Sequence, residues 1–426
     1  MRILFLTDNY LPHAGGARVY YHELYRGLVR RYADTTVHIL TKRTPGWQAF
    51  DSRECDDRLK ISRKFKPLPN WKYGQLPKIA GPFLHALPFL LRRRVDVVHF
   101  GDLYPQGVIC LALKRLLGVR YIAYCHGEEI TVTDHFRYQP RVRNAVLQAA
   151  DAVIAANEFA RQNLIRIGVP AARVHKILPG VDRQKFRPGP ADPALVKRLG
   201  LENKLVLLTV GRLTRRKNHD AVFDALAAVG QEFSGLAYLI VGTGEERDRL
   251  ERRATDLGLG QTVRFVGQVS DEELADYYRL ADVFVLPNRA EASGDVEGFG
   301  MVFIEANACG KPVIGGRSGG ALEAIVDGQT GLLVDPNNID DLISALRSTL
   351  RDRALRQRMA QAALRHAQQF DWDNSVKLLR AVSEEVLGSS VASGAKSLSS
   401  SRLGSSSASD QSRERVKTAD SYSRVE

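Results

Sequence analysis

The sequence predicts an α/β protein built from two similar halves that face a cleft, each half a parallel sheet with helices on both faces. The first observation is a repeated alternation of short apolar runs with segments of helix length, which is typical of such sheets. The second is the length of 426 residues, which is too long for one ordinary hydrophobic core. The third is a connector at 186–204, punctuated by proline and glycine, after which the alternation starts again.

The apolar runs give the expected strands of each half. In the first half they are Ile3–Thr7, Val37–Leu40, Val95–Val98, Tyr121–Tyr124, Val153–Ala156 and Val174–Ile177. In the second half they are Leu205–Val210, Tyr238–Val241, Val263–Val266, Val283–Leu286, Pro312–Gly315 and Leu332–Val334. A helix is expected from Ala17 to about Tyr32, and a last helix opens at Trp372.

These patterns divide the chain into five parts. We expect a first Rossmann-like, doubly wound domain at 1–185, a linker at 186–204 and a second such domain at 205–370. A helix at 371–387 follows, with a return to the first domain as one option. The serine-rich segment 388–426 has almost no large apolar side chains, so we expect a disordered tail.

Composition narrows the class of protein and its partners. With 44% hydrophobic and 26% charged residues, the chain reads as soluble and globular. A net charge of +13 and a pI near 9.6 favour an anionic partner. Nucleic acid is disfavoured, because neither an RNA-binding sheet pattern nor a zinc-finger spacing is present. No apolar window reaches the roughly 20 residues of a spanning helix, and the four cysteines are scattered singly, so we expect a cytoplasmic protein.

One segment suits an anionic membrane surface. Arg58 to Lys78 is basic and carries aromatic residues, and the apolar run Ile79–Leu91 follows it, closed by Arg92-Arg93-Arg94. A basic segment beside a short apolar helix is typical of interfacial binding. The alternative is a solvated loop next to a core helix. We therefore expect either a purely soluble protein or a peripheral one bound through Arg58 to Arg94 on the inner face of the cell membrane.

Several predicted strands end in residues that suit a phosphorylated ligand. Gly15-Gly16 lies between the first strand and a helix, where free backbone amides and the helix dipole attract anions, although a plain tight turn fits as well. His126 follows a strand directly. In the second half, Arg212 and Lys217 stand five apart just past a strand, where a diphosphate needs a guanidinium and an ammonium.

Two further glycine turns follow strands of the second half. Gly242 lies in Gly242-Thr243-Gly244, which lets the backbone approach a ligand closely but lacks the rest of a dinucleotide fingerprint. Ser318-Gly319-Gly320 precedes a short helix and is a further candidate group of anion-binding amides. Each turn alone is a weak signal.

The segment from Glu297 to Glu305 places a carboxylate in a loop and a second one inside an apolar helix. A buried, unpaired carboxylate costs several kcal/mol, so a polar partner should face Glu305. The alternative is that Glu305 lies on the solvent face of the helix and Glu297 only decorates a loop. The motifs elsewhere in the chain favour a ligand as the partner, with Gly298, Phe299 and Gly300 as the turn between the two carboxylates.

Taken together, these motifs resemble glycosyltransferase family 4, the retaining sugar-nucleotide enzymes of GT-B architecture, over nearly the whole chain apart from the tail. The matching pieces, in order, are Gly15-Gly16, His126-Gly127-Glu128, Gly211-Arg212 with Lys217, Gly242-Thr243-Gly244, Glu297 to Glu305, Gly319-Gly320 with Glu323, and Thr330 to Val334. The loop Gly294–Gly300 and the run Ile304–Gly310 look most similar to GDP-mannose-dependent phosphatidylinositol mannoside mannosyltransferases. Asn218 departs from the family pattern, in which glycine commonly follows the lysine.

The resemblance implies transfer of a hexosyl group from a nucleoside diphosphate with retention at the anomeric carbon. It implies a catalytic set of His126, Arg212, Lys217 and Glu297. Donor contacts would add Gly15, Gly16, Gly242, Val266, Gly298, Phe299, Gly300 and Glu305. The two cations would neutralise the leaving diphosphate, so no metal and no cofactor beyond the nucleotide sugar is expected.

Three functions remain distinct after this comparison. The first is a mannosyltransferase that uses GDP-mannose and a lipid-linked or saccharide acceptor of the cell envelope. The second is a transferase of the same fold that uses a UDP sugar. The third is a catalytically silent protein that binds a nucleotide sugar at a membrane surface, which the presence of both cations, His126 and the two glutamates disfavours.

Overall fold

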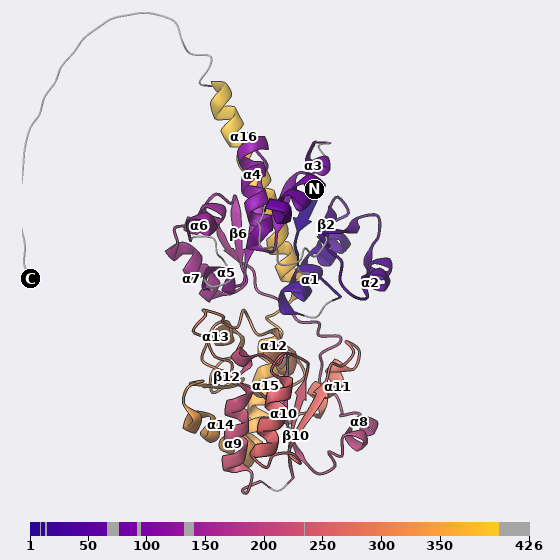
Figure 1. Ribbon diagram of the computed structural model, residues 1–426, viewed down its shortest axis with the longest axis vertical. Helices are drawn as coiled ribbons and strands as arrows, with labels where there is room; N and C mark the ends of the chain where they lie inside the picture. The colour runs from indigo at the N-terminus through magenta and orange to yellow at the C-terminus, as the bar shows by residue number, and fades with distance from the viewer. Residues whose placement is uncertain are drawn as a thin grey trace, which may run out of the picture. The chain divides into compact units, whose positions relative to one another are not determined.

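The computed structural model describes residues 1–8, 10–12, 15–65, 76–91, 95–131, 140–233 and 235–399. The chain separates into two compact units, Met1–Val386 and Leu387–Glu426. The first unit holds both sheets and the helices that cover them (Figure 1).

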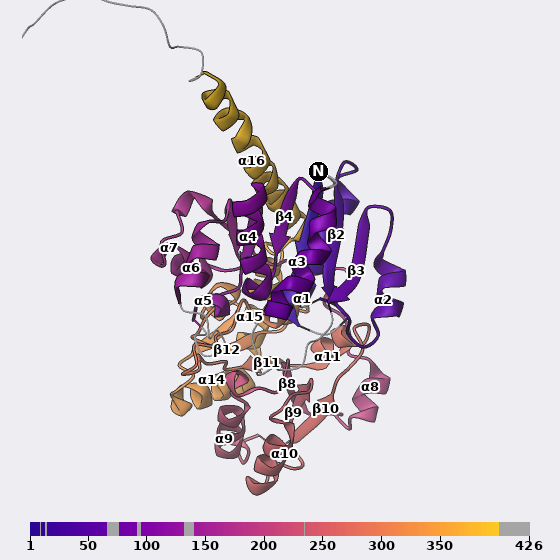
Figure 2. The same cartoon turned by 45° about the horizontal axis from the view of Figure 1, so that its top comes forward.

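The first half of this unit is a seven-stranded parallel sheet in the order β3-β2-β1-β4-β5-β6-β7 (Figure 2). Its strands are β1 (Arg2–Leu6), β2 (Thr36–Lys42), β3 (Leu59–Phe65), β4 (Val97–Phe100), β5 (Tyr121–Cys125), β6 (Ala152–Ala155) and β7 (Val174–Lys176). The strand order reverses between β1 and β4. In such sheets ligands bind beyond the carboxyl ends of the strands at this point.

The second half is a six-stranded parallel sheet in the order β10-β9-β8-β11-β12-β13. Its strands are β8 (Leu205–Val210), β9 (Leu236–Val241), β10 (Val263–Gly267), β11 (Val283–Leu286), β12 (Val313–Gly316) and β13 (Gly331–Val334). Here the order reverses between β8 and β11, so the loops that follow these two strands leave the sheet side by side.

The connections between strands are mostly helical. In the first half they are α1 (Gly16–Arg31), α2 (Trp47–Glu54), α3 (Leu76–Leu91), α4 (Val108–Leu117), α5 (Glu128–Thr131), α6 (Pro140–Gln148) and α7 (Glu158–Arg166). From the linker onward they are α8 (Pro193–Arg198), α9 (His219–Val229), α10 (Arg247–Asp256), α11 (Leu274–Leu280), α12 (Met301–Ala308), α13 (Ala321–Ala324), α14 (Ile339–Arg351), α15 (Arg353–Ala367) and α16 (Trp372–Ser399).

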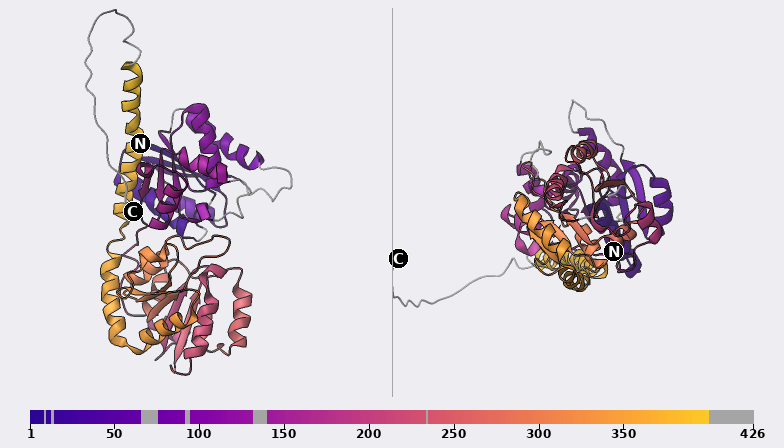
Figure 3. Two further views of the ribbon diagram at one scale, coloured as in Figure 1. Left: turned by 90° about the vertical axis from the view of Figure 1, so that its left-hand side faces the viewer. Right: turned by 90° about the horizontal axis from the view of Figure 1, so that it is seen from below.

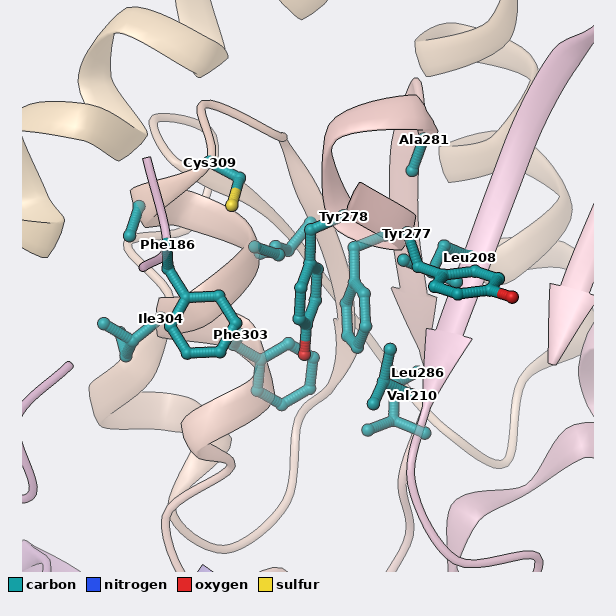
Figure 4. Close-up of a cluster of buried hydrophobic side chains, with 14 of the residues drawn as sticks. Phe186, Leu208, Val210, Tyr277, Tyr278, Ala281, Leu286, Phe303, Ile304 and Cys309 are labelled. Carbon is teal, nitrogen blue, oxygen red and sulfur yellow. The ribbon is translucent and has the colours of Figure 1, made fainter. Parts of the chain in front are cut away.

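Each central strand buries side chains on both faces, which confirms the predicted α/β class with two parallel sheets. In β8, Leu207 packs with residues of α9, α10 and α14. Its neighbour Leu208 points to the opposite face and joins a cluster with Phe186, Tyr278 and Leu286 (Figure 4). Because successive strand residues face opposite sides, one continuous apolar run serves two cores.

Strand β3 was not expected, because its sequence lies inside the basic segment that begins at Arg58. It pairs with β2 at the edge of the first sheet. The apolar alternation that would reveal it is interrupted by Arg63, whose buried guanidinium binds the carboxylate of Asp51 at 2.8 Å and the carbonyl of Lys42 at 3.1 Å. The prediction of one uninterrupted surface segment from Arg58 is therefore wrong for this strand. Residues 66–75 and 92–94 lie outside the described residues.

The two halves are joined at neighbouring points of the chain. The amide of Val181, just before the linker, donates to the carbonyl of Phe370 at 3.1 Å. A side chain at Gly180 would place its Cβ 2.4 Å from the amide nitrogen of Trp372, so these segments touch through their main chains. The outgoing and returning chain segments therefore run in contact.

The first part of α16 returns to the first half, as Figure 3 shows for the yellow helix. Ser375 donates to the carbonyl of Leu178 at 2.6 Å, and Arg380 pairs with Asp34 at 2.7 Å. The helix continues past Leu387, where the sequence was expected to end it, and runs to Ser399. No proline interrupts that stretch, and single glycines weaken a helix by only about 1 kcal/mol each. The rest of the predicted disordered tail, 400–426, lies outside the described residues.

Among the described residues, none of the helices combines the length and the apolar character needed to cross a membrane.

Candidate active site

The centre of the candidate site is a buried group of charges on the loops that follow β8 and β11. Lys217 donates from Nζ to Oε2 of Glu297 at 2.6 Å, and Arg216 donates from Nη1 to the same oxygen at 2.8 Å. The guanidinium of Arg216 also reaches Asp295 at 3.2 Å. Arg216, Lys217 and Glu297 are each no more than 8% exposed. The arrangement makes Glu297 part of an ionic network rather than a loop decoration.

The network keeps Glu297 ionised. Burial alone raises the pKa of its carboxyl, but the charges of Lys217 and then Arg216 outweigh burial and lower the pKa to about 2. Burial lowers the pKa of the Lys217 ammonium, with Glu297 opposing the shift. A carboxylate held this way accepts hydrogen bonds and does not supply protons at neutral pH.

Sequence reasoning missed Arg216 and selected Arg212 instead as the partner of Lys217. Arg215 to Lys217 form a 3₁₀ turn, η3, which carries Arg216 and Lys217 into the interior. Arg215 stays exposed and pairs with Glu246. The run of three cations was visible in the sequence, but only the geometry of the turn decides which of them face Glu297.

Arg212 is placed differently from Lys217. It is exposed, and among the described residues no carboxylate forms an ion pair with it. Arg18, on the first turn of α1, lies close enough that the charge of Arg212 contributes, after burial, to lowering the pKa of Arg18. Two guanidinium groups from different halves of the unit thus face the same region, an arrangement that an anionic ligand stabilises.

Asn218, which follows Lys217, occupies a position where the family pattern commonly has glycine. Asn218 has φ of 56° and ψ of 41°, the left-handed conformation in which glycine is common and asparagine is tolerated. Its side-chain amide donates to the carbonyls of Pro287 and Pro336, both at 3.1 Å. Asparagine therefore keeps the turn that glycine makes elsewhere and adds two bonds across the loops.

The turn Gly298-Phe299-Gly300 presents the start of α12. Gly300 precedes the helix with φ of 79°, and a Cβ there would lie 2.6 Å from the ring of Phe303. Within the described ranges, the amides of Phe299, Gly300 and Met301 have no hydrogen-bond acceptor. Free amides at the amino end of a helix attract anions, which suits the donor contacts that the family resemblance implies for this turn.

A second helix start lies opposite. Gly16 is exposed at the first position of α1, and a Cβ on it would lie 3.8 Å from Sδ of Met301. Gly15, which precedes the helix, accepts hydrogen bonds from the amides of Arg18 and Val19 through its carbonyl. The amino ends of α1 and α12 therefore meet, and both dipoles favour negative charge at that place.

Two of the three amides in the loop Ser318-Gly319-Gly320 are bonded within the protein. The amide of Gly320 donates to the carbonyl of Glu297 at 2.9 Å, and that of Ser318 donates to Gly316 at 2.7 Å. A Cβ at Gly320 would lie 2.0 Å from the carbonyl oxygen of Gly298. These residues support the turn beside Glu297 through main-chain contact.

Gly242 is likewise explained by contact within the protein. A Cβ there would lie 2.0 Å from the carbonyl oxygen of Gly211, so the close approach is between the loops after β8 and β9. Val266 sits where the pairing of β10 with β9 shifts by one residue, which takes its backbone out of the regular ladder.

His126, directly after β5, is held from several sides. Its amide and that of Gly127 donate to Oε2 of Glu129 at 2.8 and 2.9 Å. Its ring nitrogen Nε2 lies 2.8 Å from the hydroxyl of Tyr21. Burial lowers the pKa of the His126 imidazole, and Glu128 and Asp102 oppose that shift.

Asn157 connects His126 with the Glu297 loop. Its side-chain amide donates to the carbonyl of His126 at 3.0 Å and also to the carbonyl of Gly298. Its Oδ1 caps α7 by accepting from the amide of Ala160 at 2.6 Å. Nearby, Glu323 accepts from the amide of Glu158 at 2.6 Å. The sequence does not show that Asn157 donates to His126 and Gly298, because an asparagine before a helix is expected only to cap that helix.

Glu305 has a protein partner, contrary to the expectation that only a ligand would face it. Tyr278 donates from its hydroxyl to Oε2 of Glu305 at 2.6 Å. Figure 4 shows the Tyr278 ring standing in the cluster beside Phe186 and Phe303. Burial raises the pKa of Glu305, with Tyr278 opposing the shift. Glu305 is half-buried, so the residue remains accessible to a ligand.

The structure therefore gathers one set of the predicted residues closely. His126, Lys217, Glu297, the 298–300 turn and Gly16 are linked by the contacts described above, with Arg212 exposed on the same loop as Lys217. Within the described residues, Gly242, Val266 and Glu305 form no hydrogen bond or ion pair with that set. Gly242 and Val266 lie at other strand ends of the second sheet, and Glu305 lies on α12. This spread fits an extended ligand with a charged centre.

Two parallel sheets carrying cations and free helix amides at their strand ends define a glycosyltransferase of the GT-B class. Residues 14–185 match the family model for glycosyltransferase family 4, and residues 193–366 match the model for glycosyl transferases group 1. The chain belongs to this glycosyltransferase family, as the similarity of its curated relatives also shows.

Two of these relatives are named for different transfer reactions. The GDP-mannose-dependent alpha-(1-6)-phosphatidylinositol monomannoside mannosyltransferase of Mycobacterium tuberculosis is 32% identical over 359 residues, covering 83% of this chain and 90% of that protein. The D-inositol 3-phosphate glycosyltransferase 1 of Catenulispora acidiphila is 33% identical over 394 residues, covering 87% of this chain and 90% of that protein.

Solved structures share the fold. Sucrose-phosphate synthase from Thermosynechococcus elongatus superposes with a TM-score of 0.76 at 24% identity, covering 91% of this chain and 100% of that one. Anabaena HepE in complex with UDP gives a TM-score of 0.74 at 23% identity, covering 90% and 100%. At this level of identity the likeness concerns the fold.

Proposed function

We propose that the chain transfers mannose from GDP-mannose, with retention, to a hydroxyl of a lipid-linked or saccharide acceptor of the cell envelope. The observation that carries this choice of donor is the identity of 31% and 32%, over most of both chains, to mannosyltransferases named for GDP-mannose. The charged centre fits a sugar diphosphate, since cations and helix amides converge on one region.

In the proposed reaction the diphosphate lies at the amino ends of α1 and α12. Exposed Arg212 binds its oxygens directly, and Lys217 adds an ammonium beside them. As the bond between the anomeric carbon and the phosphate oxygen breaks, negative charge grows on the phosphate, and these groups stabilise it in place. Because the cations supply this stabilisation, we propose that the reaction needs neither a metal ion nor another cofactor.

The remaining residues hold the sugar and the nucleoside. Glu297 accepts hydrogen bonds from sugar hydroxyls through its second carboxylate oxygen, His126 contacts the sugar near the reacting carbon, and Glu305 accepts from the ribose diol. The acceptor oxygen forms its bond on the face that the phosphate leaves, through an oxocarbenium-like state. The acceptor proton passes to the departing phosphate oxygen, which balances the reaction.

A matched pair of variants tests the diphosphate site. Arg212→Ala should lower sugar transfer about 100-fold or more, because it removes stabilisation of the developing charge. Arg215→Ala is the control, since it removes an exposed cation from the same loop that pairs with Glu246 instead. Near-normal turnover of Arg212→Ala, or equal losses in both variants, contradicts the assignment.

A panel of GDP and UDP sugars tests the donor. Thermal shift and donor hydrolysis are measured without an acceptor. A ligand present at 100 times its Kd stabilises the protein by about 2.7 kcal/mol, so the preferred donor gives a clear shift. A response to GDP-mannose supports the proposal, and a response to UDP-glucose or a UDP-N-acetylhexosamine alone replaces it with the second function.

A different acceptor for the proposed transfer also has support. The relatives named D-inositol 3-phosphate glycosyltransferase are as similar to this chain as the mannosyltransferases are. A soluble inositol phosphate acceptor is therefore a specific alternative to a lipid. Product analysis with D-inositol 3-phosphate and with phosphatidylinositol mannoside, using the donor that the panel selects, separates the two.

We also propose that the enzyme works at the inner face of the cell membrane through α3 (Leu76–Leu91), the apolar helix that lies within the predicted segment from Arg58 to Arg94. Leu84 and Leu91 of α3 are 62% and 64% exposed, and Leu116 on the neighbouring α4 is 71% exposed. Exposed apolar side chains on two helices in contact suit a membrane surface.

Co-sedimentation with vesicles tests this surface. Binding to phosphatidylglycerol vesicles, but not to phosphatidylcholine vesicles, is expected, and Leu84→Ser should reduce it. Leu378→Ser is the control, because Leu378 is a leucine of α16 that is 49% exposed. Absence of binding at low salt contradicts the proposal.

A further inference from the structure

The hydroxyl of Tyr21 lies within hydrogen-bond distance of two groups, the carbonyl oxygen of Gly101 and Nε2 of His126. It is 2.9 Å from the carbonyl oxygen of Gly101 and 2.8 Å from Nε2 of His126. A phenol has one proton to donate, and a carbonyl can only accept. When Tyr21 donates to Gly101, its oxygen can meet His126 only by accepting a proton that Nε2 carries.

The surroundings of Tyr21 hold this arrangement in place. Its side chain is buried on α1, and its ring packs against His126 with centroids 5.4 Å apart. A Cβ at Gly101 would lie 2.8 Å from the Tyr21 ring, so glycine is needed for the ring to occupy this position. The hydroxyl is therefore fixed relative to both partners.

The other ring nitrogen of His126 is left for a ligand. Across the described residues, Nδ1 of His126 has no hydrogen-bond partner, and the residue is partly exposed. Glu128 and Asp102 act on the ring as charges, and Tyr20 packs against it with centroids 5.4 Å apart. A neutral imidazole protonated at Nε2 carries a lone pair at Nδ1.

We infer that Tyr21 is a positioning residue that holds His126 in the neutral, Nε2-protonated tautomer, so that Nδ1 accepts a hydrogen bond from a sugar hydroxyl. His126 then recognises a hydroxyl as a hydrogen-bond acceptor and does not deliver a proton to the leaving group. The role in sugar recognition rests on the proposed function. The tautomer itself does not.

The chain offers a matched control for the test. Tyr20 is the neighbouring buried tyrosine and also packs on the His126 ring, but its hydroxyl donates to the carbonyl of Ile177 at 2.7 Å. Tyr20→Phe therefore removes a buried hydroxyl of the same kind and leaves Nε2 of His126 with its partner.

The first measurement is nitrogen NMR of the full chain labelled with ¹⁵N-histidine, without substrate, with the His126 signals assigned by their loss in His126→Asn. In the wild type and in Tyr20→Phe, we expect Nε2 to have the shift of a protonated nitrogen and Nδ1 that of a bare one. In Tyr21→Phe both signals should move toward each other as the two tautomers mix. A wild-type ring protonated at Nδ1, or an unchanged spectrum in Tyr21→Phe, overturns the inference.

The second measurement is steady-state turnover with the donor that the sugar panel selects. Tyr21→Phe should lower kcat/KM by about threefold to tenfold, the effect expected from the loss of one hydrogen bond that orients His126. Tyr20→Phe should lower it less. Equal losses in the two variants would assign the effect to packing and overturn the positioning role. A protein with the expected tautomer but no transfer activity would contradict the proposed function alone.

Discussion

Lys217 and Glu297 share a hydrogen bond of 2.6 Å across the loops that follow β8 and β11. These two strands are neighbours at the point where the order of the second sheet reverses. The cation loop and the glycine turn that opens α12 are thereby tied together by opposite charges inside the protein. The same carboxylate that is proposed to hold the sugar also fixes the position of the ammonium proposed to face the phosphate.

Removing this carboxylate should destabilise the fold. Glu297→Gln leaves Lys217 and Arg216 buried without their main counter-charge, and breaking a buried ion pair costs about 3–5 kcal/mol. Urea unfolding measures the loss. Glu245→Gln is the control, because Glu245 is exposed and its change should cost less than about 0.5 kcal/mol. A loss at Glu297 no larger than that of the control would contradict the buried network.

The carboxyl of Glu297 also makes the free energy of unfolding depend on pH. The folded pKa of Glu297 is about 2, against an ordinary value of 4.5. Since the folded pKa is depressed, the stabilisation is present above pH 4.5 and is lost as pH falls through that range toward 2. The slope contributed is up to about 1.4 kcal/mol per pH unit. Urea unfolding at pH 4.5, about 3.5 and about 3 should show a shallower slope in Glu297→Gln than in the wild type.

Asn157→Asp tests the bridge between His126 and Gly298. Aspartate keeps the oxygen that caps α7, but it has no proton to donate to either carbonyl. Leaving buried acceptors unpaired costs about 1–3 kcal/mol, so kcat/KM should fall about tenfold to a hundredfold. Asn163→Asp is the control, because that amide donates to Phe159 within the same helix. Unaltered turnover in Asn157→Asp would show that the bridge does not serve the reaction.

The ion pair between Arg63 of β3 and Asp51 of α2 leads to a prediction about stability. Asp51→Ala should lower the free energy of unfolding by about 3–5 kcal/mol, because it leaves the guanidinium of Arg63 buried without a counter-charge. Asp57→Ala changes an exposed aspartate nearby and serves as control in the same urea titration. If the two variants unfold alike, Arg63 does not depend on Asp51.

The sequence predicts those parts of the fold in which apolar periodicity is uninterrupted. All six strands of the second half appear where the apolar runs lie, because each serves two cores. Strand β3 is not predicted because Arg63 occupies one of its inward positions. Asp51, the ion-pair partner of Arg63, lies on another element, α2. A pattern within one segment cannot show a partner that only the folded chain brings near.

The candidate site divides in the same way. Residue types at strand ends identify Lys217, Glu297 and the turn that opens α12. They do not identify Arg216, whose direction depends on a 3₁₀ turn, or Asn157, whose second partner lies 141 positions along the chain. For Glu305 the sequence predicts a ligand as the polar partner, but the hydroxyl of Tyr278, on a different helix, also fills that role.

The contact between Val181 and Phe370 has a mechanical consequence. The chain passes between the two sheets twice, and both passages run through the same spot. The covalent connections between the halves are thus confined to one place, and their other links, such as Asn157 to Gly298, are non-covalent. A substitution at Gly180, whose Cβ would strike Trp372, would therefore disturb both covalent connections at once without touching a residue proposed to bind the donor.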